Sequence, residues 1–244
     1  MARSEVDYCL LESLFREGLF NLNEEVNRAG ALINTKIIQD NPVFLWGLGA
    51  ALGRLIIETV KPGNKKIRLV GIPSAGSDLV AAVMQPEWWE YFRYYRLRET
   101  PKKVGAYQNR YAMTKCPDED EIHVLVDDFL AHGLSKIKTF EVLENEGFHF
   151  PYLFTLFDFN YEGRKRILKK WPHIKIHAWF TIDETTAYFW DKAMISEKDY
   201  SAVREFIQTE IRRVAAIEKK EEEKLRILRE EKLRILRVVN KSTR

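Results

Sequence analysis

Two adjacent carboxylates, Asp127 and Asp128, carry the clearest chemical signal in the sequence. They follow the apolar run 122–126, and a short segment with Gly133 and Ser135 then leads into a helical pattern. Ligands of α/β sheets bind where strands end, and the N–H groups at the start of a helix bind anions. Carboxylate oxygens accept hydrogen bonds from sugar hydroxyls and can hold hydrated Mg²⁺. The pattern therefore predicts a ligand with a sugar and a phosphate; the alternative is that the acids simply face solvent.

A second turn, formed by the small residues 73–76, follows the apolar run 67–72 in the same way. It reads Pro-Ser-Ala-Gly, and Ser77 after it is expected to cap the next helix. Small side chains let backbone amides approach a ligand closely. The order of strand, turn and helix thus occurs twice, and both turns are candidates for ligand contact.

The elements that must position these turns alternate between helix and strand. Apolar residues at helical spacing predict helices at 5–29, 43–60, 77–84 and 135–146. Short apolar runs predict strands at 67–72, 122–126, 151–159 and 174–182. The basic stretch 164–170 separates the last two strands. Alternation of this kind is typical of a parallel sheet covered by helices on both faces, so we expect an α/β fold.

The composition narrows the class of protein. The chain has 244 residues, of which 45% are hydrophobic and 31% charged, which excludes a disordered chain and a disulfide-stapled miniprotein. A net charge of +3 gives no argument for a nucleic-acid or membrane partner. Cys9 and Cys116 lack zinc-type spacing, and the longest weakly charged stretch, 43–53, is shorter than the roughly 20 residues of a membrane span. With no secretory segment recognised, we expect a cytoplasmic protein.

The last part of the sequence differs in composition. After Ser196–Asp199, which has the form of a capping box, the chain becomes helical and then consists mostly of Glu, Lys, Arg and Leu. The run Glu-Lys-Leu-Arg-Ile-Leu-Arg occurs at 223–229 and again at 231–237, an offset that matches neither the heptad nor the eleven-residue coiled-coil period. We expect a domain at 1–215 and a charged helical tail at 216–244. The tail is a solvated helix, an oligomerisation helix or a contact for nucleic acid.

The segment that contains the two acids, 122–135, resembles the phosphoribosyl pyrophosphate (PRPP) motif of the type I phosphoribosyltransferases. Residues 70–81, Val-Gly-Ile-Pro-Ser-Ala-Gly-Ser-Asp-Leu-Val-Ala, are similar to the turn that contacts pyrophosphate and substrate in the orotate phosphoribosyltransferases of that family. Residues 98–105, Arg-Glu-Thr-Pro-Lys-Lys-Val-Gly, resemble their mobile catalytic loop; the alternative is a basic surface loop. Arg28-Ala-Gly30 with residues 33–40 resembles their amino-terminal substrate segment. The resemblance covers about residues 5–212 in the family's order.

The resemblance implies a mostly parallel sheet flanked by helices, a small hood formed by about residues 1–42, and a homodimer. Asp127 and Asp128 would hold the ribose hydroxyls and Mg²⁺, directly or through water. The catalytic residues would further include Arg98 and Lys102, which would stabilise the leaving pyrophosphate. Substrate contacts are implied for Arg28, Ser74, Ala75, Gly76, Lys103, Ala131, His132, Gly133, Leu134, Ser135 and Phe159.

Several residues depart from the family's pattern. Hydroxyl residues usually flank the Gly of the phosphate loop, whereas Ala131, His132 and Leu134 stand there in this chain. Val104 takes the place of the catalytic-loop His. Phe159 takes the place of an Arg that contacts orotate, so it would either stack on a different base or belong to the core.

The resemblance implies that the protein transfers ribose 5-phosphate from PRPP to a base, with orotate as the first candidate and Mg²⁺ as the cofactor. This activity belongs to pyrimidine nucleotide synthesis. The departures leave a second interpretation open, in which the fold binds PRPP or a nucleotide without catalysis, as a sensor or assembly module.

The aromatic group at 88–95 predicts either a subunit interface or a packed helix-to-strand junction. The expected partners are PRPP, a base or nucleotide and a second copy of the chain, with no membrane and no nucleic acid.

Overall fold

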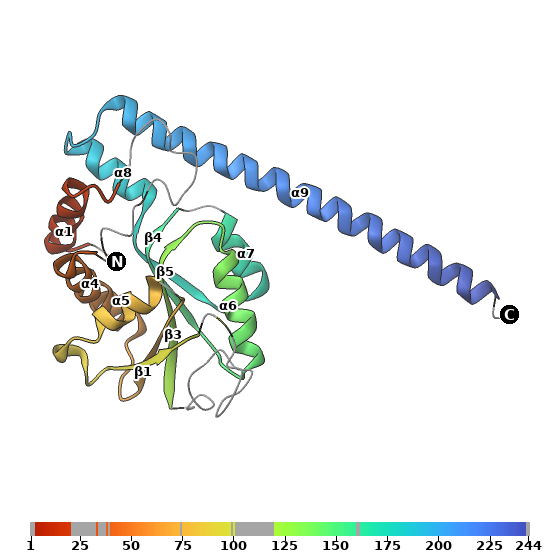
Figure 1. The fold of residues 1–244 in the computed structure, drawn as a ribbon, viewed down its shortest axis with the longest axis horizontal. Coiled ribbons are helices and arrows are strands. Elements are labelled where there is room, and N and C mark those ends of the chain that lie inside the picture. The colour runs from red at the N-terminus through yellow and green to blue at the C-terminus, as the bar shows by residue number, and fades with distance from the viewer. Residues whose placement is uncertain are drawn as a thin grey trace.

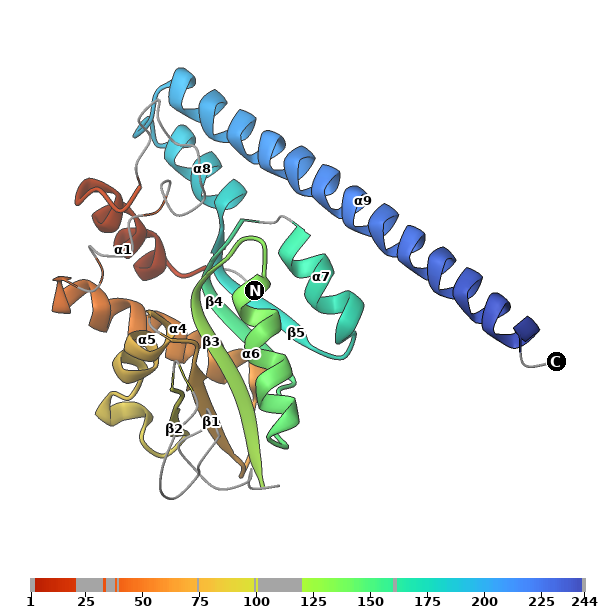
Figure 2. The same cartoon turned by 45° about the vertical axis from the view of Figure 1, so that its right-hand side comes forward.

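Five parallel strands form the centre of the fold, hydrogen-bonded in the order β2-β1-β3-β4-β5 (Figure 1 and Figure 2). The computed structural model describes residues 3–20, 33, 38, 40–73, 75–98, 100, 120–159 and 162–242. The strands are β1 (Lys66–Gly71), β2 (Phe92–Arg96), β3 (Glu121–Leu130), β4 (Tyr152–Asp158) and β5 (Lys175–Thr181). The helices are α1 (Glu5–Arg16), α4 (Pro42–Val60), α5 (Ala75–Val83), the short 3₁₀-helix η1 (Pro86–Trp88), α6 (Leu134–Asn145), α7 (Glu162–Lys170), α8 (Ile182–Asp191) and α9 (Glu197–Ser242). This arrangement confirms the expected α/β fold.

The strand order reverses at the boundary between β1 and β3. From β1 the chain crosses to β2 on one side, and it then forms β3, β4 and β5 on the other side. Gly71 at the end of β1 lies opposite Val126 of β3. In open parallel sheets the connections diverge at such a point and leave a crevice at the carboxyl ends of the strands. The topology therefore favours a ligand site just beyond Gly71 and Val126.

Helices cover both faces of the sheet. Figure 2 shows α4 and α5 on one side of β3 and α6 and α7 on the other. Val124 and Val126 of β3 belong to the hydrophobic cluster under α4 and α5, whereas Leu125 packs in a second cluster with Phe140 of α6 and Ile167 of α7. The alternation arises because successive side chains of a strand point to opposite faces. β3 is therefore buried from both sides.

Helix α1 is attached to the sheet by Asp7, a buried carboxylate in its first turn. Asp7 accepts hydrogen bonds from Arg54 of α4 at 2.8 Å and from the indole N–H of Trp179 in β5 at 3.0 Å, and it forms a capping box with Ser4. Burial by itself would raise the pKa of Asp7, but the hydrogen bonds from Ser4 and Trp179 and the charge of Arg54 lower it below the ordinary value. The amino-terminal helix is thus held by an ionised group.

Two predicted helices have different ends in the structure. The helix predicted at 5–29 ends at Arg16, because Gly18 adopts a left-handed conformation with φ 82° that turns the chain. Most of the remaining part of that segment lies outside the described residues. The helix predicted to be capped by Ser77 begins earlier, so Ser77 lies inside α5. Close backbone packing fixes this start, since a Cβ at Gly76 would lie 2.3 Å from a carbonyl oxygen of β3.

The aromatic group at 88–95 forms a helix-to-strand junction. Trp88 ends η1, while Phe92, Tyr94 and Tyr95 belong to β2, a strand that the sequence pattern did not predict. Phe92 is fully buried and joins the core on the α4 and α5 side. Aromatic residues are frequent in strands, so the composition that indicated a junction also accounts for β2.

The capping box predicted at Ser196–Asp199 begins α9. The Asp199 N–H donates to Ser196 Oγ, and the Ser196 hydroxyl donates to Asp199 Oδ2 at 2.6 Å. The first turns pack on the body through the buried side chains of Val203 and Ile207. Beyond them the same helix continues to Ser242 and extends away from the sheet (Figure 1). The predicted boundary between 215 and 216 thus falls within one continuous helix.

Among the described helices, α4 has the length and apolar composition of a membrane span. Half of this stretch is buried inside the protein. At Gly49 the helix approaches α5 so closely that an added Cβ would lie 2.3 Å from the carbonyl oxygen of Ala82. Packing against α5 and the sheet therefore accounts for much of the apolar surface of α4.

Replacing Gly49 by alanine should destabilise the protein. The methyl group would collide with the α5 backbone, and over-packing of this kind costs about 1–3 kcal/mol. Gly47→Ala in the same helix is the matched control, because its Cβ would meet the flexible end of the Leu10 side chain at 3.2 Å. Denaturant unfolding followed by circular dichroism should give a lower free energy of unfolding for Gly49→Ala than for Gly47→Ala. Equal stability of the two variants would contradict the close α4–α5 contact.

Candidate functional site

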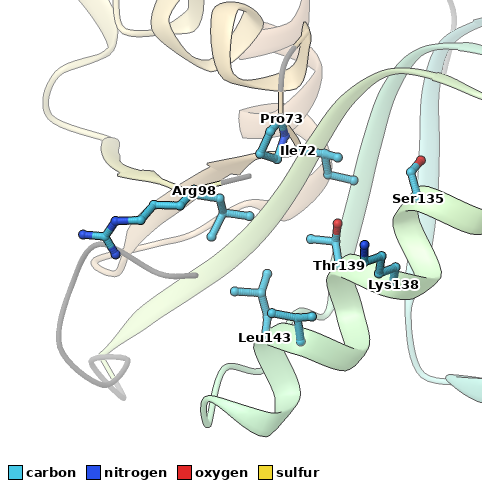
Figure 3. Close-up of a pocket in the computed structure, with 9 residues that line it drawn as sticks. Ile72, Pro73, Arg98, Ser135, Lys138, Thr139 and Leu143 are labelled. Atoms are coloured by element: carbon cyan, nitrogen blue, oxygen red, sulfur yellow. The ribbon is translucent and has the colours of Figure 1, made fainter. Parts of the chain in front are cut away.

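A pocket of about 200 Å³ lies between the carboxyl ends of β1 and β2 and the side of α6 (Figure 3). Three of its residues come from separate predicted segments: Pro73 from the small-residue turn, Arg98 from the basic loop and Ser135 from the segment after the two acids. The full lining is Ile72, Pro73, Leu97, Arg98, Ser135, Lys138, Thr139, Val142 and Leu143. The fold thus brings together three segments, each of which the sequence had separately indicated as a candidate for ligand contact.

The pocket combines positive charge, hydroxyl groups and apolar walls. Figure 3 shows Ser135 and Thr139 on the side of α6 that faces Ile72, whereas the Arg98 guanidinium extends away from α6. Arg98 and Lys138 are the cationic residues of the lining, and the described lining residues include no carboxylate. Such a set suits an anionic ligand with a less polar body.

The two acids lie inside β3 rather than in a loop after it. The strand runs to Leu130, and Asp127 lies opposite Thr155 of β4. The predicted strand at 122–126 was too short, because the pairing with β4 continues past the acids. Asp127 and Asp128 are only 5% and 8% exposed. This burial contradicts the alternative that they simply face solvent.

A lysine that the sequence pattern did not single out is paired with Asp127. Lys136 Nζ, from the first turn of α6, lies 2.5 Å from Asp127 Oδ2, and both side chains are more than nine-tenths buried. Charged groups are rarely buried unless they are paired. A lysine in a helical pattern is normally assigned to the solvated face, so no sequence signal separated Lys136 from Lys138, the other lysine of α6.

Asp128 has a strongly raised pKa. Its Oδ1 accepts the N–H of Phe129 at 2.8 Å, and its own N–H donates to Asp127 Oδ1 at 3.0 Å. Burial and the neighbouring charge of Asp127 raise the pKa of Asp128 to about 7, although Lys136 opposes the shift. Near neutral pH, Asp128 can therefore either donate a hydrogen bond to a hydroxyl group or accept one.

The segment between β3 and α6 is supported from behind by α7. Gly133 caps α6 with φ 75°, and a Cβ at Gly163 in α7 would lie 2.2 Å from the carbonyl oxygen of Ala131. Leu134 and Ser135, at the start of α6, are exposed. Among the described residues, no side chain caps this helix start, so the N–H groups of its first turn and the Ser135 hydroxyl are suited to an anion.

His132 links this segment to α9. Its Nε2 lies 3.4 Å from Glu210 Oε2, and Glu210, only 4% exposed, also pairs with Arg213 at 2.9 Å. Arg166 of α7 donates to the carbonyl oxygen of His132 at 3.4 Å. Burial and the charges of Arg213 and Arg166 lower the pKa of His132, although Glu210 opposes this. To serve as the predicted phosphate donor, the His132 side chain would have to leave Glu210.

The remaining predicted site residues fall into two groups. Outside the described residues lie Arg28, Ser74, Lys102, Lys103 and Val104. Ala75 and Gly76 form the start of α5, close to the pocket residue Pro73. Phe159 is fully buried, and its ring packs against Phe129 with the centroids 5.8 Å apart. This packing favours the alternative that Phe159 is a core residue.

Known proteins match this chain in structure only. No protein-family model and no curated protein matches the sequence. The UMP synthase of Leishmania donovani matches with a TM-score of 0.63 at 15% identity, covering 84% of this chain and 43% of that chain. The orotate phosphoribosyltransferase of Francisella tularensis matches with a TM-score of 0.61 at 16% identity, covering 85% and 98%. That of Mycobacterium tuberculosis in complex with 5-phospho-α-D-ribosyl 1-diphosphate matches with a TM-score of 0.52 at 11% identity, covering 75% and 93%.

The chain therefore has the α/β fold of the type I phosphoribosyltransferases. The orotate phosphoribosyltransferases named above are matched over nearly their full length, whereas the chain spans less than half of the UMP synthase. Because one fold can support different activities, the function has to be inferred from the residues of the site.

Neutralising Asp128 should change how stability depends on pH. The folded-state pKa of about 7 lies above the ordinary value of 3.8, so the folded protein binds this proton more tightly, and stability falls as pH rises between these values. Asp128→Asn cannot ionise, and its free energy of unfolding should exceed that of the wild type above pH 7 by about 1–3 kcal/mol. Denaturant titrations between about pH 5 and pH 8 measure this difference. Asp191→Asn, at an exposed position, is the control. If the free energy of unfolding of Asp128→Asn depended on pH in the same way as that of the wild type, the raised pKa of Asp128 would be contradicted.

Proposed function

We propose that the protein is a phosphoribosyltransferase that binds PRPP at the carboxyl ends of β1 and β3 and transfers its ribose 5-phosphate to a base, with orotate as the first candidate. The observation that carries the proposal is the buried acid pair, Asp127 and Asp128, at the strand-order reversal and near a pocket with two cations. Sugar hydroxyls need acceptors and phosphates need cations, and both are present at this edge of the sheet. The fold is shared with an orotate phosphoribosyltransferase solved in complex with PRPP.

Different residues would hold different parts of PRPP. Asp127 and Asp128 would accept hydrogen bonds from the ribose hydroxyls. Ser135 and the first-turn N–H groups of α6 would hold the 5′-phosphate. Arg98 and Lys102, helped by the adjacent lysine, would stabilise the pyrophosphate as a base nitrogen displaces it from the anomeric carbon. These roles use the positions that the sequence resemblance selected.

A second candidate is a module that binds PRPP or a nucleotide without catalysis. Phe159 favours it: this residue stands where the resembled family has an orotate-contacting Arg, and it is fully buried against Phe129. Ala131 and Leu134 also lack the hydroxyl groups that the family places around its phosphate-loop Gly. A site altered in this way would keep the acid pair and still recognise a phosphorylated ribose.

Other parts of the proposal follow from the resemblance. They are a homodimer, a cytoplasmic location, and a domain at 1–215 followed by the tail at 216–244. Light scattering at working concentration tests the homodimer, and a monomer would count against the sharing of a mobile loop between subunits.

Calorimetric titration with PRPP and Mg²⁺, followed by a pyrophosphate-release assay with orotate and a panel of other bases, tests the function directly. We expect saturable PRPP binding and release of pyrophosphate with one base. Asp128→Asn should bind and turn over less well while remaining folded, because a ribose acceptor is lost. Binding without release for any base would favour the non-catalytic module. The absence of PRPP binding would overturn both candidates.

Replacing Arg98 by alanine should weaken PRPP binding about tenfold or more, because one of the two pocket cations is lost. Arg93→Ala, at an exposed position near the other end of β2, removes the same charge away from the pocket and is the matched control. The measurement is the dissociation constant from calorimetry. If both variants weakened binding equally, general electrostatic attraction rather than the pocket would be responsible.

A further inference from the structure

Lys136 places a positive charge inside the candidate site. Its ammonium group lies 2.5 Å from Asp127 Oδ2 and 5.4 Å from the centre of the Phe129 ring, and the lysine is 5% exposed. A carboxylate and the face of an aromatic ring are the two kinds of group that stabilise a buried cation. The carboxylate and the aromatic ring therefore fix the position of the ammonium group on the α6 side of β3.

Most of the oxygens of the acid pair are already engaged. Asp127 Oδ2 faces the ammonium, and Asp127 Oδ1 accepts the N–H of Asp128. Asp128 Oδ1 accepts the N–H of Phe129. A divalent cation prefers several oxygen ligands arranged around it. Three of the four carboxylate oxygens here already have partners within the chain.

A Mg²⁺ ion bound directly by the acid pair, one of the two arrangements that the resemblance implies, does not fit this donor set. In the part of the chain that the structure describes, no group of three or more His, Cys, Asp or Glu side chains could hold a metal ion. A cation bound directly to Asp127 would also have to displace Lys136 Nζ from a buried contact. The chain itself thus supplies one positive charge beside Asp127, at the contact that a directly bound ion would need.

We propose that Lys136 takes the place of a divalent cation beside Asp127, so that PRPP or another phosphorylated ribose binds at this site without a divalent metal. The inference rests on the proposed function for the identity of the ligand. Lys136 acts as a positioning and specificity residue, because it holds the Asp127 carboxylate through the ion pair and offsets its charge next to a polyanionic ligand. Arg98 and Lys138 add the remaining positive charge at the pocket.

Titration with Mn²⁺ alone tests the role of Lys136 without any other ligand. Wild type and Lys192→Met, which removes an exposed lysine just after α8 and away from the pocket, should show no saturable Mn²⁺ binding by electron paramagnetic resonance. Lys136→Met should gain one Mn²⁺ site, and the double variant Lys136→Met with Asp127→Asn should lose it. An Asp127-dependent Mn²⁺ site in the wild type, or no gain in folded Lys136→Met, would overturn the proposal.

Removal of one partner of a buried ion pair can prevent folding, so a second measurement uses the wild type alone. PRPP is titrated by calorimetry in EDTA and in Mg²⁺, and the two dissociation constants should agree within about twofold. Binding at least about tenfold weaker in EDTA would overturn the proposal. If PRPP gave no heat in either condition, the proposed function would fail, and the Mn²⁺ titration would still decide whether Lys136 replaces the metal.

Discussion

The buried ion pair between Asp127 and Lys136 joins the middle strand of the sheet to the helix that starts at its carboxyl end. Removing one partner of such a pair typically costs about 3–5 kcal/mol, because the other charge is left buried and unpaired. The pair therefore fixes the first turn of α6 relative to β3. That position in turn determines where Ser135 and Thr139 face the pocket (Figure 3).

The same segment is fixed on its other side by contacts that come from much later in the sequence. Gly163 lets α7 approach the backbone at Ala131, and Glu210 of α9 meets His132. The residues that would receive a phosphate are thus held between β3, α7 and α9. The long helix thus contacts this segment through a buried carboxylate.

Much of the fold could be predicted from the sequence, because apolar periodicity and small-residue turns are local signals. The strands at 67–72 and 174–182 and the helix at 43–60 are found within a residue or so of their predicted bounds. β3 was predicted too short because its last residues include Asp127 and Asp128, which read as a polar loop; their burial depends on β4 and α6. The same holds for the site. Its acids and turns have local signatures, whereas Lys136 and Glu210 are distinguished only by the surfaces that close over them.

The described site is better suited to the phosphoribosyl group than to a particular base. Acceptors, hydroxyl groups and cations gather around the ends of β1 and β3, where a sugar phosphate can be recognised by charge and hydrogen bonding. At the end of β4, by contrast, Phe159 packs against Phe129, and Phe157 packs against Phe20 with their centroids 5.5 Å apart. A base could enter this aromatic cluster only by displacing core side chains that are fully buried. In the proposed activity, selection of the acceptor would therefore have to come from another part of the sheet edge, and it could differ from orotate selection even though the fold is shared.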